Sequence, residues 1–224
     1  SIIQMFAVAT LKEAVDLRDL GVKQDILVLG AIPLEDLDIA IKKNISLALF
    51  SFDYLNKINE MHHYDAPVKV HLSIDSGMNR IGFKTEKEFE KAMEMIDSSK
   101  IDVEGIFTHF ATADEKDKTA AYRQFELFKT FVEKLENEGM HFKYRHCSNS
   151  AGIIDMPDVN MDMVRLGIAM YGMYPSEEVS HDVVELKPAI ELKSSVTMVK
   201  TIQPGERVSY NGTFEAKRVT RLAT

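Results

Sequence analysis

The sequence predicts an α/β protein: a (β/α)8 barrel of the TIM type that lacks its first strand, followed by the start of an all-β C-terminal domain. Short β-type runs alternate with helical patterns from the N-terminus to about residue 172. Runs such as 26–30 and 47–50 are apolar on both faces, as strands between helices and a barrel interior are. After residue 175 the pattern changes to alternating β-branched residues with Pro-Gly and Asn-Gly turns. We therefore expect a barrel domain at 1–175 and a β-domain beginning at 176–224.

Seven segments in the first part have the character of strands: 4–10, 25–30, 45–51, 68–75, 103–112, 143–150 and 164–172. A closed barrel of this type needs eight strands, so one is missing. An open doubly wound sheet is the alternative architecture. It is less favoured because no GxGxxG motif follows the first strand.

The segments between the strands carry helix start and stop signals. Thr10 with Glu13, and Thr85 with Glu88, have the spacing of capping boxes, and Gly21 follows the end of the first helical pattern. Further helices are expected at 33–44, opened by a proline, and at 120–139. Because strands and helices alternate with short connections, the sheet should be parallel.

The composition excludes several classes of protein. Of the 224 residues, 45% are hydrophobic, which is too many for a disordered chain, and a net charge of −8 disfavours nucleic-acid binding. The longest apolar run, 26–32, is too short to span a membrane. The single cysteine, Cys147, fits a reducing compartment, so we expect a soluble cytoplasmic protein. The chain starts at Ser1 and stops at Thr224 within a strand-like run, so we expect both ends to be truncated.

Polar residues that follow the strands are the candidates for function, since active sites of parallel barrels lie at the carboxyl ends of the strands. Arg80, His109, His146, Ser150 and Arg165 occupy such positions. Each has an ordinary structural explanation: a surface arginine, two core histidines, a helix N-cap and a buried ion pair. Together they offer two cations, two imidazoles and an anion-binding serine, which would suit a phosphorylated aromatic cofactor.

A metal site is the rival use of the same part of the sequence. His71, Asp75, His109 and His146 are chemically suitable ligands. No pair of them has the local spacing that is typical of metal-binding motifs, so this alternative is disfavoured.

Several motifs resemble bacterial alanine racemase, a pyridoxal-phosphate enzyme built from a barrel and a β-domain. They occur in this order: FAVAT, DILVLG, DSGMNRIGF, GIFTHFATAD, HCSNSAG, MVRLGIAMYG and QPGERVSYNGTF. The resemblance implies interconversion of L- and D-alanine by two bases on opposite faces of the substrate, supplying D-alanine for peptidoglycan. It also implies a homodimer in which each β-domain covers the partner's barrel.

The resemblance implies seven cofactor-binding residues: Arg80, His109, His146, Ser150, Arg165, Gly167 and Ile168. Arg80 would reach the phenolic oxygen of the cofactor and the substrate carboxylate, and His109 would lie beside the pyridine ring. His146 would be a second pocket-lining histidine. Ser150 and the backbone of 167–168 would hold the phosphate.

Arg165 corresponds to an arginine that is hydrogen-bonded to the pyridine nitrogen. An arginine donates a hydrogen bond but does not readily supply a proton, so the ring should stay neutral. A neutral ring is a weaker electron sink, which favours reprotonation of the substrate over transamination.

The sequence departs from the family at three points. The resemblance places the Schiff-base lysine of the family ahead of the FAVAT strand and the opposing tyrosine after the RLAT strand, so we expect neither in this chain and do not assign the tyrosine's role to Tyr210. Ser73 stands where many members have a lysine that buttresses the cofactor-contacting arginine, so an anion, a water or Asp75 would orient Arg80 instead. We therefore expect no catalytic base in this polypeptide and negligible racemase activity.

Other functions remain open at this point. A serine or broad-specificity amino-acid racemase would share the fold, and an amino-acid decarboxylase of the same fold type is a further alternative, although its signatures are not evident. A non-catalytic pyridoxal-phosphate carrier of the barrel-only type is disfavoured by the β-domain that begins near residue 176.

Overall fold

The computed structural model describes residues 3–61, 63 and 66–224, and the chain divides into two compact units, Ser1–Lys187 and Pro188–Thr224. Residues 176–187 pack with the first unit. Val179 is buried in its core, and the backbone N–H of Ser180 donates to the carboxylate of Asp155. The domain boundary expected after residue 175 stays a prediction.

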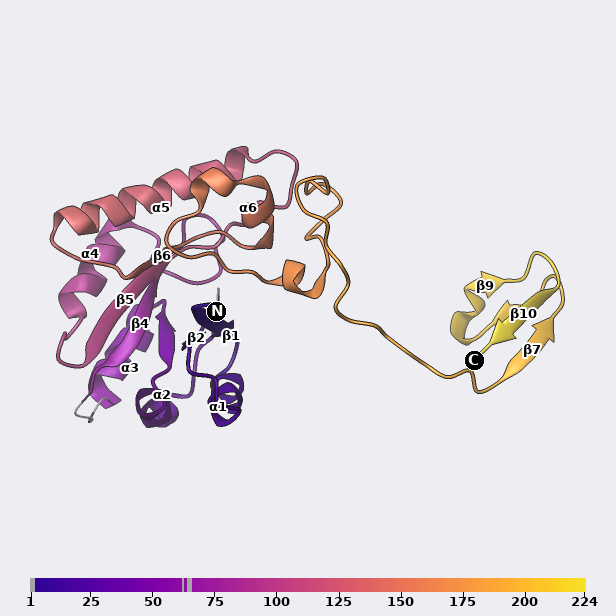
Figure 1. The fold of residues 1–224 in the computed structure, drawn as a ribbon, viewed down its shortest axis with the longest axis horizontal. Coiled ribbons are helices and arrows are strands. Elements are labelled where there is room, and N and C mark those ends of the chain that lie inside the picture. Colours follow the sequence, from indigo (N-terminus) through magenta and orange to yellow (C-terminus); the bar gives the residue numbers. More distant parts are fainter. Residues whose placement is uncertain (1–2, 62, 64–65) are drawn as a thin grey trace. The chain divides into compact units, whose positions relative to one another are not determined.

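The first unit is built on a curled, six-stranded parallel sheet (Figure 1). Its strands are β1 (Met5–Val8), β2 (Asp25–Val28), β3 (Ser46–Leu49), β4 (Val68–Ser73), β5 (Ile101–Phe107) and β6 (Tyr144–His146). Each strand pairs with the next along the chain, which is the order of a barrel and differs from the reversal of order in a doubly wound sheet. The predicted fold class, an incomplete barrel followed by β structure, is confirmed.

Helices connect successive strands, and most of them begin where the sequence predicts. They are α1 (Leu11–Asp19), α2 (Leu37–Lys42), preceded by the 3-10 turn η1 (Leu34–Asp36), α3 (Phe52–Met61), α4 (Glu86–Met95), α5 (Thr119–Asn137) and α6 (Ser150–Asp155). Both predicted capping boxes, at Thr10 and at Thr85, are present. Helix α3 was not expected from the sequence, although Ser51 caps it by accepting a hydrogen bond from the backbone N–H of Tyr54.

The strand predicted at 164–172 is wrong. Asp162 and Arg165 each donate one backbone hydrogen bond toward the β6 side, to the carbonyls of Arg145 and Ser148, but no continuous ladder forms. At Gly167 the backbone leaves the extended conformation, and its N–H donates to the Ser150 side chain. The next residues form a 3-10 helix, η3 (Ile168–Tyr171), so an apolar run that looks like a strand in the sequence forms a loop and a short helix here.

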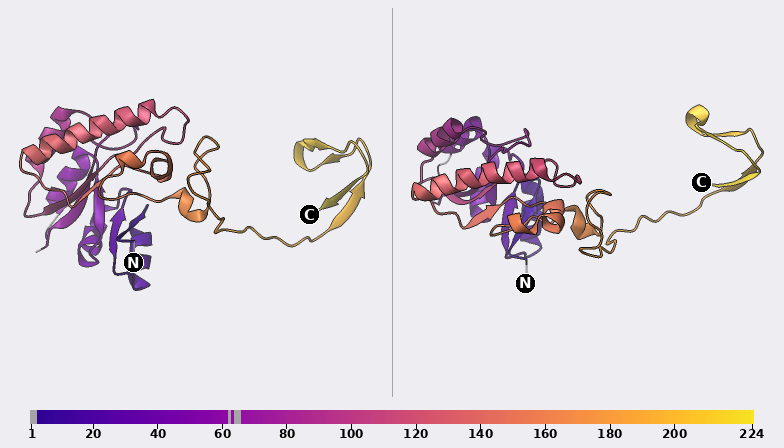
Figure 2. Two further views of the ribbon diagram at one scale, coloured as in Figure 1. Left: turned by 45° about the horizontal axis from the view of Figure 1, so that its top comes forward. Right: turned by 90° about the horizontal axis from the view of Figure 1, so that it is seen from above.

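The core lies between the sheet and the helices. It includes apolar strand residues such as Ile26, Leu47 and Leu72, all fully buried. Helices α4 and α5 lie side by side (Figure 2): Phe89 packs against Phe131, and Lys134 of α5 pairs with two glutamates of α4.

The second unit consists of four short antiparallel strands. They are β7 (Val199–Ile202), β8 (Arg207–Val208), β9 (Phe214–Glu215) and β10 (Thr220–Ala223). The predicted Asn211-Gly212 turn joins β8 to β9 as a hairpin, with both residues at positive φ. The Pro204-Gly205 turn does not make a hairpin, because β7 pairs with β10 instead of β8.

Arg18 on α1 connects the chain segments that lead into β2 and β3. Its guanidinium donates to four backbone carbonyls, those of Val22, Gln24, Lys43 and Asn44. Replacing Arg18 with alanine leaves these carbonyls without their donor and should lower the free energy of unfolding by about 3 kcal/mol in urea titrations. The exposed variant Lys12→Ala is the control and should change it by less than about 0.5 kcal/mol. Equal effects of the two variants would contradict this role of Arg18.

Candidate functional site

A pocket of about 470 Å³ lies in the first unit and brings together residues from the carboxyl ends of the strands. Five of the seven predicted cofactor-binding residues line it: His109, Ser150, Arg165, Gly167 and Ile168. Arg80 and His146 are not among its lining residues. Apolar side chains, including those of Met78 and Phe110, complete the wall.

Arg165 is a half-buried guanidinium whose neighbours are carbonyls and imidazoles. Nη1 donates to Nδ1 of His146 at 2.7 Å, and Nη2 donates to the carbonyl oxygens of Thr108 at 2.7 Å and Cys147 at 3.0 Å. It makes no ion pair with any described residue, so the structural ion pair considered from the sequence is not found. Burial, with a further effect of the positive charge of Arg80, lowers the pKa of Arg165 to about 10. It therefore remains charged at neutral pH, and its Nε–H forms no hydrogen bond within the described chain.

His146 lies behind Arg165 and is not among the residues that line the pocket, so the role that the resemblance implies for it stays a prediction. It is fully buried, and burial followed by the charge of Arg165 holds the pKa of its imidazole well below the ordinary value. Because Arg165 donates to Nδ1, the proton of the neutral ring is on Nε2, which donates to Nδ1 of His71 at 2.8 Å. The proton of His71 is then on its Nε2, a buried atom for which the described residues provide no partner.

His109 follows β5 and lies beside Arg165, with 3.3 Å between its Nδ1 and Nη2 of the guanidinium. Burial, then the positive charges of Arg165 and Arg80, lower the pKa of its imidazole to about 4. The ring is therefore neutral at physiological pH, and His109 lines the pocket.

Ser150 is the first residue of α6 and not its N-cap, contrary to the structural explanation that the sequence offers for it. Asn149 caps α6 by accepting a hydrogen bond from the backbone N–H of Gly152. The Oγ of Ser150 instead accepts from the backbone N–H groups of Gly167 at 2.9 Å and Ala169 at 3.3 Å. These bonds hold the loop at 167–169 against the start of α6. The contact of Ala169 with Ser150 was not expected from the sequence.

Arg80 is exposed on the loop that follows β4, and it forms no hydrogen bond or ion pair with the described residues. The carboxylate of Asp75 does not orient the guanidinium. Its Oδ1 accepts from the backbone N–H groups of Gly77 at 3.0 Å and Asn79 at 2.8 Å, so it orders the loop that carries Arg80. Ser73 is buried in β4.

The rival metal site is not supported. Among the residues that the structure describes, no group of three or more His, Cys, Asp or Glu side chains is placed to hold a metal ion. Both ring nitrogens of His146 are engaged by His71 and Arg165.

Among the described residues, no helix combines the length and the apolar character that crossing a membrane requires.

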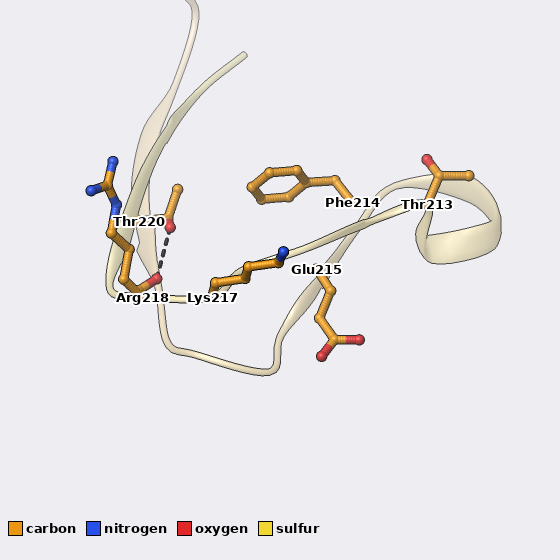
Figure 3. A pocket seen from close by; sticks show the side chains of 6 residues that line it. All are labelled: Thr213, Phe214, Glu215, Lys217, Arg218 and Thr220. Carbon is orange, nitrogen blue, oxygen red and sulfur yellow. Dashed lines mark hydrogen bonds between the residues drawn. The ribbon is translucent and has the colours of Figure 1, made fainter.

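A second hollow, of about 700 Å³, lies on the second unit (Figure 3). Its side chains come from 213–220, and Figure 3 shows Glu215 and Arg218 pointing away from Phe214 rather than toward a common centre. Phe214 is half exposed. The first pocket is therefore the better candidate for a site.

The first pocket fits a flat aromatic ligand that bears an anionic group. Arg165 supplies a charged donor with its Nε–H unused, and His109 supplies a neutral ring at the wall. The hydroxyl of Ser150 keeps its own proton available, because its oxygen only accepts from the loop. Gly167 lies directly beside Ser150: a Cβ there would be 3.5 Å from the Ser150 hydroxyl, an ordinary van der Waals contact.

Comparisons with known proteins agree with this geometry. Residues 2–175 match the family model of the alanine racemase N-terminal domain, and residues 189–224 match that of the C-terminal domain. Alanine racemase of Desulforamulus reducens is 41% identical over 97% of this chain, and that of Clostridium perfringens is 39% identical over 97%. The solved alanine racemase of Clostridium difficile superposes with a TM-score of 0.87, at 39% identity over 99% of the chain.

The chain spans about 60% of the length of these relatives: 60% for Desulforamulus reducens, 57% for Clostridium perfringens and 58% of the solved structure. Both family models match in the same order along the chain, first the barrel part and then the β part. The fold, the two matches and these identities together show that this chain belongs to the alanine racemase family.

Proposed function

We propose that the protein carrying this chain is a pyridoxal-phosphate-dependent alanine racemase that interconverts L- and D-alanine. The observation that supports this most directly is the pocket in which Arg165, with no carboxylate partner in the described chain, lies with His109, Ser150 and Gly167. The donor set matches what a phosphorylated pyridine requires: a donor for the ring nitrogen, a flat neighbour and donors for phosphate. When bound, this cofactor delocalises the negative charge that is left on the substrate α-carbon after proton removal.

Different residues of this chain would contact different parts of the cofactor. Arg165, held by His146 and by two backbone carbonyls, would donate to the pyridine nitrogen, and Ser150 with the backbone of 167–168 would hold the phosphate. His109 would lie against the ring. Arg80, whose guanidinium has no partner in the described chain, would turn toward the phenolic oxygen and the substrate carboxylate.

Arg165 also favours racemisation over competing reactions. Its pKa of about 10 keeps the guanidinium protonated near pH 7, and a guanidinium is a poor source of a proton for the pyridine nitrogen. The nitrogen would stay unprotonated, so the substrate carbon would be reprotonated quickly. The bases that remove and return the α-proton are not assigned to residues of this chain.

We further propose that the protein is a cytoplasmic homodimer. Six apolar side chains in the segment 164–173 are more than a third exposed: Val164, Leu166, Ile168, Met170, Tyr171 and Met173. Exposed apolar patches of this kind mark interfaces, and a second copy covering the mouth of the pocket would bury this one. The buried, unpaired thiol of Cys147 is compatible with a reducing compartment.

Racemisation tests the proposal directly. The protein carrying this chain, supplied with pyridoxal phosphate, should convert L-alanine to a mixture of enantiomers. Chiral chromatography measures the conversion. L-serine and L-lysine in parallel reactions distinguish an alanine racemase from one of broad specificity, which would turn over all three at similar rates. Absence of turnover with every amino acid, despite bound cofactor, would contradict the racemase assignment.

A further inference from the structure

We propose that Gln124, a buried polar residue of α5, positions His109 and links it to the loop that carries Arg80; this deepens the proposed function by assigning a positioning residue to the same site. Gln124 is 6% exposed and belongs to the face of α5 that packs on the unit's core. A glutamine that is buried so fully must have its amide satisfied. Its partners are the backbone next to the site.

The amide of Gln124 holds the backbone on both sides of Phe110. Oε1 accepts from the backbone N–H of Ala111 at 2.9 Å, and Nε2 donates to the carbonyl oxygen of His109 at 3.1 Å. Strand β5 ends at Phe107, so no neighbouring strand holds this part of the chain. The glutamine therefore takes the place of a strand partner and fixes where the His109 ring enters the pocket.

The same side chain contacts the loop after β4. At Gly77, which has φ of +142°, a Cβ would lie 3.2 Å from Cγ and 3.4 Å from Nε2 of Gln124. The amide thus packs directly on the glycine backbone. Met78, the next residue, lines the pocket, and Arg80 follows on the same loop. One side chain consequently fixes the spacing between the His109 segment and the Arg80 loop.

The test uses Gln124→Met, which keeps the length and burial of the side chain but removes both hydrogen bonds, and Gln124→Glu, which keeps an acceptor for Ala111 and loses the donor to His109. Two-dimensional NMR of the histidine ring measures the His109 titration without cofactor. In the parent protein the pKa of His109 is about 4; in Gln124→Met it should rise toward 6.5, as the ring moves away from Arg165 and into water. Gln124→Glu should give a smaller rise.

Leu135→Ala is the matched control, because Leu135 is buried in the last turn of the same helix and has no part in the site. It should lower stability while leaving the His109 titration unchanged. Affinity for pyridoxal phosphate should fall about tenfold in Gln124→Met and stay within twofold of the parent in Leu135→Ala. A folded Gln124→Met protein with the parent's His109 titration would overturn the positioning role. Failure of the parent protein to bind the cofactor would count against the proposed function alone, since the NMR readout requires no ligand.

Discussion

Replacing Arg165 with leucine is expected to lower the free energy of unfolding of the first unit by about 3–5 kcal/mol and to abolish measurable binding of pyridoxal phosphate. The substitution removes the donor for two backbone carbonyls and for Nδ1 of His146. Thr108, His146 and Cys147 are all buried, so water does not replace the lost donor. Each buried group left without its partner destabilises the folded state by about 1–3 kcal/mol. Part of this loss is offset because the leucine variant no longer has to remove a guanidinium from water on folding.

Urea titrations followed by circular dichroism measure the stability, and the change in cofactor absorbance measures the binding. Arg165→Lys is the matched variant. It keeps the positive charge but presents a single ammonium group in place of the planar guanidinium, so both effects should be intermediate. An Arg165→Leu protein as stable as the parent would show that the contacts of the guanidinium contribute nothing net. Undiminished cofactor binding in that variant would remove Arg165 from the proposed site.

Acid should destabilise the first unit well before its carboxylates titrate. The folded state holds the pKa of His71 and of His109 at about 4, in both cases mainly because of burial, and burial likewise holds the pKa of His146 well below its ordinary value. In the unfolded chain these imidazoles titrate near 6.5. The unfolded state therefore binds more protons below pH 6.5, so stability is complete above that pH and is lost as the pH falls toward 4.

The loss attributable to His71 alone is about 3 kcal/mol between pH 7 and pH 4, from about 1.4 kcal/mol per pKa unit. The decisive window is pH 6.5 to 5, where the ion-paired carboxylates stay ionised and only imidazoles take up protons. Urea titrations across this window should show that the free energy of unfolding falls as the pH is lowered. The slope of that free energy against pH should correspond to more than one additional proton bound by the unfolded state. Lys12→Ala, an exposed variant that removes no imidazole, should leave the slope unchanged. A flat profile from pH 7 to 5 would show that the buried imidazoles are not held neutral.

Local interactions explain how much of the fold could be predicted from the sequence. The capping boxes at Thr10 and Thr85 depend on residues three apart, and the apolar runs of β2 and β3 show their burial directly. The missed helix α3 and the wrong strand at 164–172 mark the limit of this reasoning. The latter run is apolar enough for a strand, but its direction is set by the Ser150 hydroxyl, which lies 17 residues away from Gly167 in the sequence.

The candidate site was predictable to a similar extent. The carboxyl ends of neighbouring parallel strands share one edge of the sheet, so polar residues that follow separate strands must lie near one another. The sequence did not reveal that His146 lies behind Arg165 or that Gln124 holds the His109 backbone. A histidine or glutamine at those positions is equally compatible with an ordinary buried or surface residue.

The sequence by itself determined the alternation of strands and helices, the parallel sheet, the change to β structure near residue 176 and the motifs of the family, because each depends on residue types and short spacings. Only the tertiary structure decided the orientation of the Arg165 guanidinium, the tautomers of His146 and His71, and the joining of the loop at 167–169 to Ser150. Those features arise from hydrogen bonds between groups far apart in the chain, whose geometry is set only when the sheet curls and brings them together.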